Sequence, residues 1–388
     1  GQTGVSVNNS GSLYANGKYA YGVYALSSGG DVSVTNADTG AIEFYSYSGS
    51  GFGVLGLASL GDVSIDNSGS IGGYAYGQSV GIFGLADQGD VSVDNSGDIY
   101  ASVDGINGFA GVAAYGIIAR GEYASVSNSG NIDVLGNGTA IGIAANSYYG
   151  SAVTNTGGSI SVAAPGNGTG IGAQSAYGDV MVDNASDLDV IGLYGSATGI
   201  NAVAGGDASV TNSGSIYAGS LYGTSIGIYG YSVGGDVTID NSGDLTAISY
   251  YGLADGIFAS GANVDVTNAG AIEVYGYTWA AGIEAQGDVS ATVDNSGDIT
   301  VVAPGFLQVH DYYGVIGYAP GAQAFGIYAT GGEGGVDLTN SGTISVDGGY
   351  VAGIEVQSSG DIGVSNSGDI VAGSGYNASY NSYNGYYY

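Results

Sequence analysis

Carboxylate side chains are the residues of this 388-residue sequence with the clearest capacity for chemistry. The chain has 34 Asp and Glu but only 2 Lys and Arg, which gives a formal net charge of -32. In two runs of three successive sequence repeats, an Asp falls at the same place, namely Asp31, Asp62, Asp90, Asp179, Asp207 and Asp236. Three interpretations stay open: a solvated acidic surface, weak cation ladders in which Ca²⁺ serves as a structural ion, or an acidic habitat in which the carboxylates are protonated.

A catalytic site has little support in the sequence. The only His is His310, which lies beside Asp311 in a long insertion and is more simply a loop residue. Cleavage of polysaccharides needs paired carboxylates, or a cation with a basic side chain, in a groove. Gly-x-Ser-x-Gly matches carry no weight among 78 glycines. We therefore expect no enzyme, no catalytic residues and no required cofactor.

Asparagine marks the corner of a repeat that runs along the whole chain. The spacings range from 26 to 45 residues and average about 30, the signature of a solenoid, propeller or array. Stacked Asn side chains can bond amide to amide, so we expect a structural ladder. Its members are Asn9, Asn36, Asn67, Asn95, Asn128, Asn155, Asn184, Asn212, Asn241, Asn268, Asn295, Asn340 and Asn366.

Three short strands per repeat must position these side chains. In the copy at residues 89–99, Val91 and Val93 alternate with polar residues, as in a strand with one buried face. The Asn-Ser-Gly that follows is turn chemistry, and Ile99 begins a second strand. A Gly-Ile-x-Ala landmark, as at residues 116–119, marks a third strand. Three strands in about 30 residues favour a parallel β-helix over a propeller blade.

Length variation is concentrated in one loop of the repeat, between the second strand and the Gly-Ile-x-Ala strand. Two large insertions fall there, at about 101–114 and 302–325. A coil that stacks on its neighbours can only bulge outward at a corner, so this loop is a free edge. The prediction is an all-β chain: one parallel β-helix of about 13 coils over residues 1–375, followed by a Tyr/Asn-rich tail at 376–388.

Tyrosine is the other unusual residue, at 34 of 388. The rings either pack over the rod with their hydroxyls exposed to solvent or form an adhesive surface that binds glycans, solid surfaces or other rods. The candidates for assembly or adhesion are Tyr376, Tyr380, Tyr383, Tyr386, Tyr387, Tyr388, Tyr312 and Tyr313. The final repeat lacks the third-strand landmark, so we expect the tail or a neighbouring molecule to complete it.

Other classes of partner are disfavoured. There is no Cys and no apolar run long enough for a membrane-spanning helix, so we expect no disulfide and no membrane insertion of this segment. The acidity makes nucleic acid an unsuitable partner. The sequence begins with Gly1, as expected of a processed, mature form.

The Gly-Asp-Val-Ser-Val-x-Asn-Ser-Gly-x-Ile repeats resemble those of β-helical passenger regions in bacterial autotransporters and related secreted adhesins. The resemblance covers the chain except its tail, and it implies an extracellular or bacterial cell-surface location. It brings no shared catalytic motif. We expect an extracellular structural protein whose β-solenoid subunits stack head to tail into a fibre or matrix filament. The alternative is a monomeric adhesin that binds glycans or surfaces through its Tyr-rich loop edge.

Overall fold

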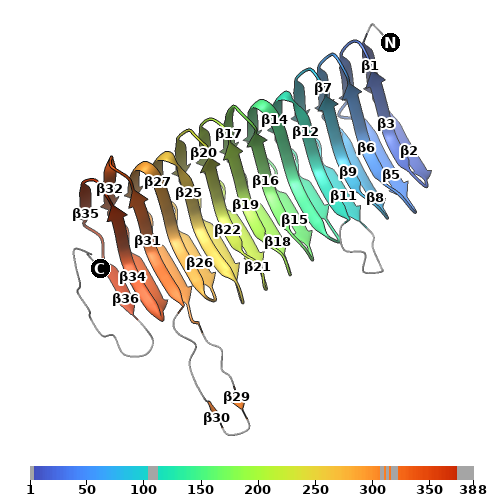
Figure 1. Cartoon of the computed structure of the whole chain (residues 1–388). Helices are drawn as coiled ribbons and strands as arrows, with labels where there is room; N and C mark the ends of the chain where they lie inside the picture. Colours follow the sequence, from blue (N-terminus) through green and yellow to red (C-terminus); the bar gives the residue numbers. More distant parts are fainter. Residues whose placement is uncertain (1–3, 104–111, 306–309, 312–313, 316–321, 374–388) are drawn as a thin grey trace.

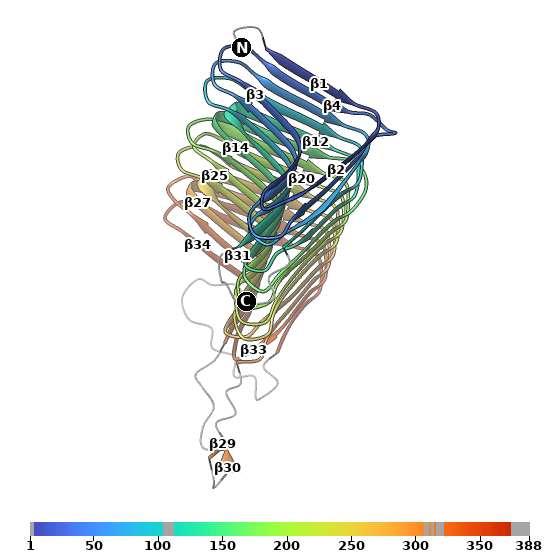
Figure 2. The same cartoon turned by 90° about the vertical axis from the view of Figure 1, so that its right-hand side faces the viewer.

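The computed structural model describes residues 4–103, 112–305, 310–311, 314–315 and 322–373. These residues form strands and turns, and no helix among them is long and apolar enough to cross a membrane. The coils stack side by side in sequence order, from β1 at one end to β35 and β36 at the other (Figure 1). Figure 2 looks along the stack, where the corners of successive coils follow one another. The predicted parallel β-helix is confirmed.

Each coil contributes a first strand that ends on the corner Asn. These strands are β1 (Val5–Asn9), β4 (Val32–Asn36), β7 (Val63–Asn67), β10 (Val91–Asn95), β17 (Asp179–Asn184), β20 (Ala208–Asn212), β23 (Val237–Asn241), β32 (Gly335–Asn340) and β35 (Ile362–Asn366). The pairing is parallel and aligns Asn with Asn, as in β7 and β10.

The second strands form a sheet of their own with thirteen members. They are β2 (Ser12–Gly17), β5 (Ala41–Ser46), β8 (Ser70–Ala75), β11 (Ile99–Val103), β13 (Ile132–Leu135), β15 (Ile160–Ala164), β18 (Leu188–Gly192), β21 (Ile216–Ser220), β24 (Leu245–Ser249), β26 (Ile272–Gly276), β28 (Ile299–Ala303), β33 (Ile344–Gly348) and β36 (Ile370–Gly373).

The third strands carry the Gly-Ile-x-Ala landmark. Eight of them are separate strands: β3 (Ala20–Ser27), β6 (Gly51–Ala58), β9 (Ser79–Ala86), β16 (Gly168–Ser175), β19 (Ala197–Ala204), β22 (Ser225–Ser232), β31 (Gln323–Gly331) and β34 (Tyr350–Ser358). The described residues thus form twelve complete coils and two strands of a thirteenth.

Four third strands run directly into the first strand of the next coil, which the three-strand prediction did not foresee. They are β12 (Ala113–Asn128), β14 (Thr139–Asn155), β25 (Leu253–Asn268) and β27 (Trp279–Asn295). In these repeats the landmark Gly lies nearer to the corner Asn than it does in most others. The shorter connection favours a bend in one strand over a separate turn.

A thin apolar core runs through the whole stack. It is built from columns of Val, Ile and Ala, such as Val63, Val91 and Ile99, which are almost fully buried. The landmark glycine makes this close packing possible. A Cβ on Gly81 would lie 2.4 Å from Ile99 Cγ2 and 2.6 Å from the carbonyl oxygen of Gly116 in the next coil. Only glycine lets the third strand approach the second this closely.

The two insertions lie between the second and third strands, as predicted. One separates β11 from β12, and the other separates β28 from β31. The described residues of the larger insertion include a short antiparallel pair, β29 (His310–Asp311) and β30 (Gly314–Val315), which Figure 1 places away from the rod.

Candidate functional site

The corner asparagines form one continuous ladder of side-chain hydrogen bonds. Asn67 Nδ2 donates to Asn95 Oδ1 at 2.6 Å, and Asn95 Nδ2 donates to Asn128 Oδ1 at 2.7 Å. The same contact joins every neighbouring pair from Asn9 to Asn366. In coils such as that of Asn95, Nδ2 also donates to the carbonyl of the corner glycine, here Gly97. These buried amides are therefore satisfied by the stack itself.

The predicted Asp ladder is also present, but its carboxylates bind backbone rather than one another. Asp31 Oδ1 accepts the N–H of Asp62 at 3.0 Å, and Asp62 Oδ1 accepts the N–H of Asp90 at 2.9 Å. Asp90 Oδ1 accepts the N–H of Tyr123 at 3.2 Å. Each carboxylate thus satisfies a corner N–H of the next coil.

The second run repeats this arrangement. Asp179 accepts from the N–H of Asp207, and Asp207 accepts from the N–H of Asp236, both at 2.8 Å. Asp236 accepts both the backbone and the side-chain N–H of Asn263. Within the described ranges, no group of three or more His, Cys, Asp or Glu side chains could hold a metal ion. The weak cation ladders and calcium binding stay predictions.

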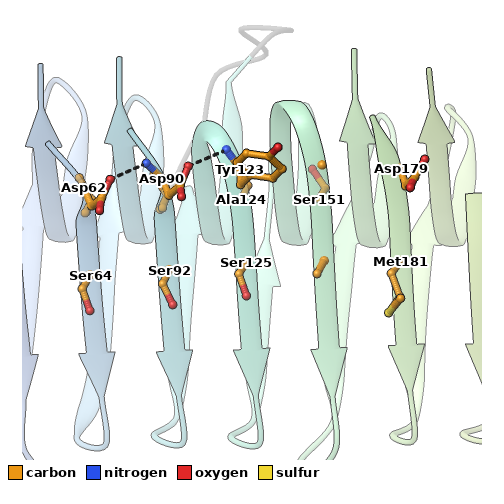
Figure 3. Close-up of a pocket in the computed structure, with 14 residues that line it drawn as sticks. Asp62, Ser64, Asp90, Ser92, Tyr123, Ala124, Ser125, Ser151, Asp179 and Met181 are labelled. Carbon is orange, nitrogen blue, oxygen red and sulfur yellow. Dashed lines mark hydrogen bonds between the residues drawn. The ribbon is translucent and has the colours of Figure 1, made fainter. Parts of the chain in front are cut away.

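A shallow groove of about 590 Å³ crosses the outer side of the first strands (Figure 3). Asp62, Asp90 and Tyr123 lie along one edge, and Ser64 and Ser92 continue in a row below them. The groove combines serine hydroxyls and corner carboxylates with apolar groups such as the Met181 side chain. This arrangement can hydrogen-bond to a polar polymer or to water.

Exposed tyrosines form a column at the variable corner. Tyr194 and Tyr222 stack with ring centres 5.9 Å apart, and Tyr222 and Tyr251 stack at 5.1 Å. Tyr277 continues the column at 6.0 Å from Tyr251. None of these four tyrosines was among the candidates for assembly or adhesion. Aligning all repeats on the landmark glycine could have found them. The column is an aromatic edge with more than half of the Tyr222 side chain exposed.

A buried acidic pair on the outer side of the third strands was also missed. Asp255 and Glu284 are each only 7% exposed. Trp279 Nε1 donates to Asp255 Oδ1 at 2.9 Å, and Gln286 Nε2 donates to Glu284 Oε1. The pair lies in columns where other coils carry Phe52, Val80 or Tyr229, so repeat alignment could have revealed it.

Burial changes the acidity of this pair. The pKa of Asp255 is raised to about 7, chiefly by loss of solvation and in part by the nearby Glu284 carboxylate, while the Trp279 hydrogen bond opposes the shift. Burial also raises the pKa of Glu284, and the hydrogen bonds from Gln286 and Trp279 counteract part of that rise. A proton is thus held near neutral pH beside the only tryptophan of the chain.

Several predicted residues fall outside the described part of the chain. They are Tyr312, Tyr313, Tyr376, Tyr380, Tyr383, Tyr386, Tyr387 and Tyr388. His310 and Asp311 are placed in β29, and the assembly or adhesion role of the tyrosines stays a prediction.

Comparison of the chain with protein-family models, with curated proteins and with solved structures finds no match. The β-helical repeats expected from the resemblance to autotransporter passengers are present. The extracellular location and the adhesin function that the resemblance implies stay predictions.

Proposed function

We propose that the chain is an extracellular structural protein, a β-solenoid subunit that stacks head to tail into a surface fibre or matrix filament. The observation that carries the proposal is the match between the strand edges at the two ends of the described stack. Residues at the same position of the repeat lie at both ends: Ile362 of β35 corresponds to Val5 of β1, Val364 to Val7, and Asn366 to Asn9. The edge of β35 can therefore receive β1 of a second copy in the register used inside the rod.

Backbone hydrogen bonding supports the same register. Val5 N–H donates to the carbonyl of Asp31 at 2.7 Å, and Val336 N–H donates to that of Asp361 at 2.9 Å. If this pattern continues across the joint, the N–H of Ile362 donates to the carbonyl of Gly4 in the second copy. Open strand edges of this kind pair readily with another chain.

The charges at such a joint are more favourable than those between coils inside the rod. Within the rod, Asp298 Oδ1 accepts the N–H of uncharged Thr343 at 2.8 Å, but Asp62 Oδ1 accepts the N–H of Asp90, so that Asp residues lie in adjacent coils. At the joint, Asp361 and Asp369 would accept the N–H groups of Gly4 and Ser12 in the second copy. Gly4 and Ser12 are uncharged, so no pair of Asp side chains faces across this contact.

An extracellular location agrees with the composition. Lys18 and Arg120 are the only Lys and Arg residues, so trypsin-like proteases have two sites in 388 residues. The resemblance to autotransporter passengers points to the bacterial cell surface. The net charge of -32 keeps separate rods apart at low ionic strength. We therefore expect assembly to be favoured by moderate salt.

Electron microscopy and light scattering of the pure protein test the proposal. We expect filaments with a subunit repeat of about 60 Å, from thirteen coils about 4.8 Å apart. The decisive variant is Ser6→Pro. Val5 bonds toward the second coil, so alternation turns the Ser6 N–H toward the open edge of β1. Proline is tolerated at such an edge but blocks the addition of a further strand.

The matched control is Ser6→Thr, which keeps the N–H and the outward hydroxyl. We expect Ser6→Pro to remain as single folded rods and Ser6→Thr to polymerise like the wild type. Short rods from the wild type at every salt concentration would overturn the proposal, as would unimpaired polymerisation of Ser6→Pro.

The alternative function is that of a monomeric adhesin, and one observation favours it. The exposed column of Tyr194, Tyr222 and Tyr251 offers adjacent ring faces at spacings of 5.9 Å and 5.1 Å, a platform on which sugar rings can stack. Retention on insoluble glycans that Tyr222→Ala abolishes, without any filament formation, would support this function instead.

A further inference from the structure

The outer side of the third strands at the N-terminal end combines an apolar surface with the absence of carboxylates. Five neighbouring strand segments form it: β3, β6, β9, and residues 113–121 and 139–147 of β12 and β14. We call this surface the neutral face. It contains no Asp or Glu and a single cation, Arg120, in a chain of net charge -32.

The outward positions of the neutral face are mostly apolar. They are Tyr21, Tyr24, Leu26, Phe52, Leu55, Leu57, Val80, Phe83, Leu85, Tyr115, Ile118, Arg120, Ile141, Ala144 and Asn146. Tyr21 and Phe52 stack with ring centres 5.5 Å apart. Val80 and Ile118 are almost fully buried, and neighbouring rings such as Phe52 and Phe83 pack against them. The face is therefore a second, external apolar layer on the sheet.

Charge separates the neutral face from the first-strand and second-strand faces of the rod. Elsewhere the outward positions of the first and second strands carry Asp66, Asp94, Asp183, Asp240, Asp265, Asp294, Asp337, Glu43, Asp133, Asp189, Glu273 and Asp347. Two copies that meet through those faces bring carboxylates together. A basic partner would be drawn to the acidic faces instead. The partner that suits the neutral face is itself mostly apolar and free of carboxylates where it touches.

The size of the face is sufficient for a specific contact. Five coils about 4.8 Å apart and strands of eight residues at about 3.3 Å each give roughly 600 Å² per copy. Twice this area is about 1,200 Å², the lower bound for stable protein interfaces. The neighbouring third strands β16 and β19 carry uncharged polar residues outward, including Thr169 and Thr198, and would form a polar rim.

We propose that two copies of this chain associate through their neutral faces as an antiparallel pair related by a two-fold axis. With the axis at β9, the strands that meet are β3 with β14 and β6 with β12. The protruding rings of Tyr21 and Tyr24 then oppose the smaller Ile141 and Ala144, and Phe83 lies near the axis. This contact is self-complementary and closes at two copies. It does not depend on the head-to-tail joint, because it uses a different surface.

Sedimentation equilibrium of the full chain tests the proposal. At micromolar concentrations we expect twice the 38.0 kDa mass of one chain. The measurement is made for the wild type and in the Ser6→Pro background, where head-to-tail growth is blocked. Tyr24→Asp and Phe83→Asp each place a carboxylate on the neutral face and should weaken the pair at least tenfold.

Met181→Asp is the matched control. Met181 is 61% exposed on the first-strand face, so the substitution makes the same change outside the proposed contact. Circular dichroism establishes that each variant is folded, and we expect Met181→Asp to remain a dimer. A wild type that sediments as a single chain at every concentration would overturn the proposal, as would equal weakening by Met181→Asp. A monomer that binds insoluble glycan through Phe83 would also overturn it, since the face would then be a glycan-binding site.

Discussion

Loss of the proton from the buried Asp255 carboxyl should make the protein less stable as the pH rises toward neutrality. The side chain is 7% exposed and its pKa is raised from 3.8 to about 7, chiefly by burial. Between these values the folded chain keeps a proton that the unfolded chain has released. The free energy of unfolding therefore falls with increasing pH and levels off above pH 7.

The size of this effect follows from the shift. A difference of about three pKa units corresponds to roughly 4 kcal/mol, since each unit is worth about 1.4 kcal/mol. About 3 kcal/mol of this loss falls between pH 5 and pH 8. Asp255→Asn keeps the shape of the side chain without an ionisable proton. We expect the variant to lose this pH dependence and to exceed the wild type in stability at pH 8.

Guanidinium chloride denaturation from pH 5 to pH 8.5, followed by circular dichroism, measures the profile, and the salt screens surface repulsion. Fluorescence of Trp279 gives a second readout in the folded state, because its indole N–H donates to Asp255. Its signal should titrate near pH 7 in the wild type but not in Asp255→Asn.

Asp94→Asn serves as the control, since it removes an exposed carboxylate from β10. It should leave the pH profile unchanged. Parallel profiles for the wild type and Asp255→Asn would refute the reasoning, as would a Trp279 signal that is flat between pH 5 and pH 8.5.

Three further predictions concern the stack. Gly81→Ala should cost several kcal/mol and lower the melting temperature, because its Cβ would lie 2.4 Å from a core methyl group, whereas Gly72→Ala, with no atom within 4 Å, should be nearly neutral. Asn212→Leu should destabilise the rod by about 1–3 kcal/mol in denaturant titrations, because it breaks two ladder bonds in the buried interior. Replacing the six corner residues Asp31, Asp62, Asp90, Asp179, Asp207 and Asp236 by Asn should keep the fold and raise stability at low salt by about 3 kcal/mol. Four adjacent pairs about 5 Å apart each cost roughly 0.8 kcal/mol in water, and thermal melts at two salt concentrations measure the difference.

The architecture was predictable because a solenoid converts sequence period into spatial columns. The corner residues Asn67 and Asn95 align in sequence and meet in space, and the variable loop bulges where stacking allows it. The continuous strands β12 and β25 were not foreseen, because only a slight shortening of the connection separates a bent strand from a turn there. The fate of such a short segment depends on the register of both neighbouring coils.

The site-level features were harder to predict because they depend on three-dimensional neighbours. The sequence showed Asp62 and Asp90 in one column, but not that each carboxylate accepts a backbone N–H from the next coil. Asp255 and Glu284 lie in different repeats and become neighbours only through the pairing of β25 with β27. Their burial also depends on the Trp279 ring, whose position no repeat pattern specifies.

The corner carboxylates suggest why so acidic a chain folds at all. Parallel strands that turn a corner leave N–H groups without a strand partner, and each must find an acceptor. Asp supplies one at several corners, but Asn131 does the same for the N–H of Ser159 at 3.0 Å, and Asn167 does so for Ser196 at 2.9 Å. The oxygen is therefore what the corner requires, and the charge is an addition to it. That addition makes the acidic faces repel one another, which is why we propose the matched ends and the neutral face as the contacts between copies.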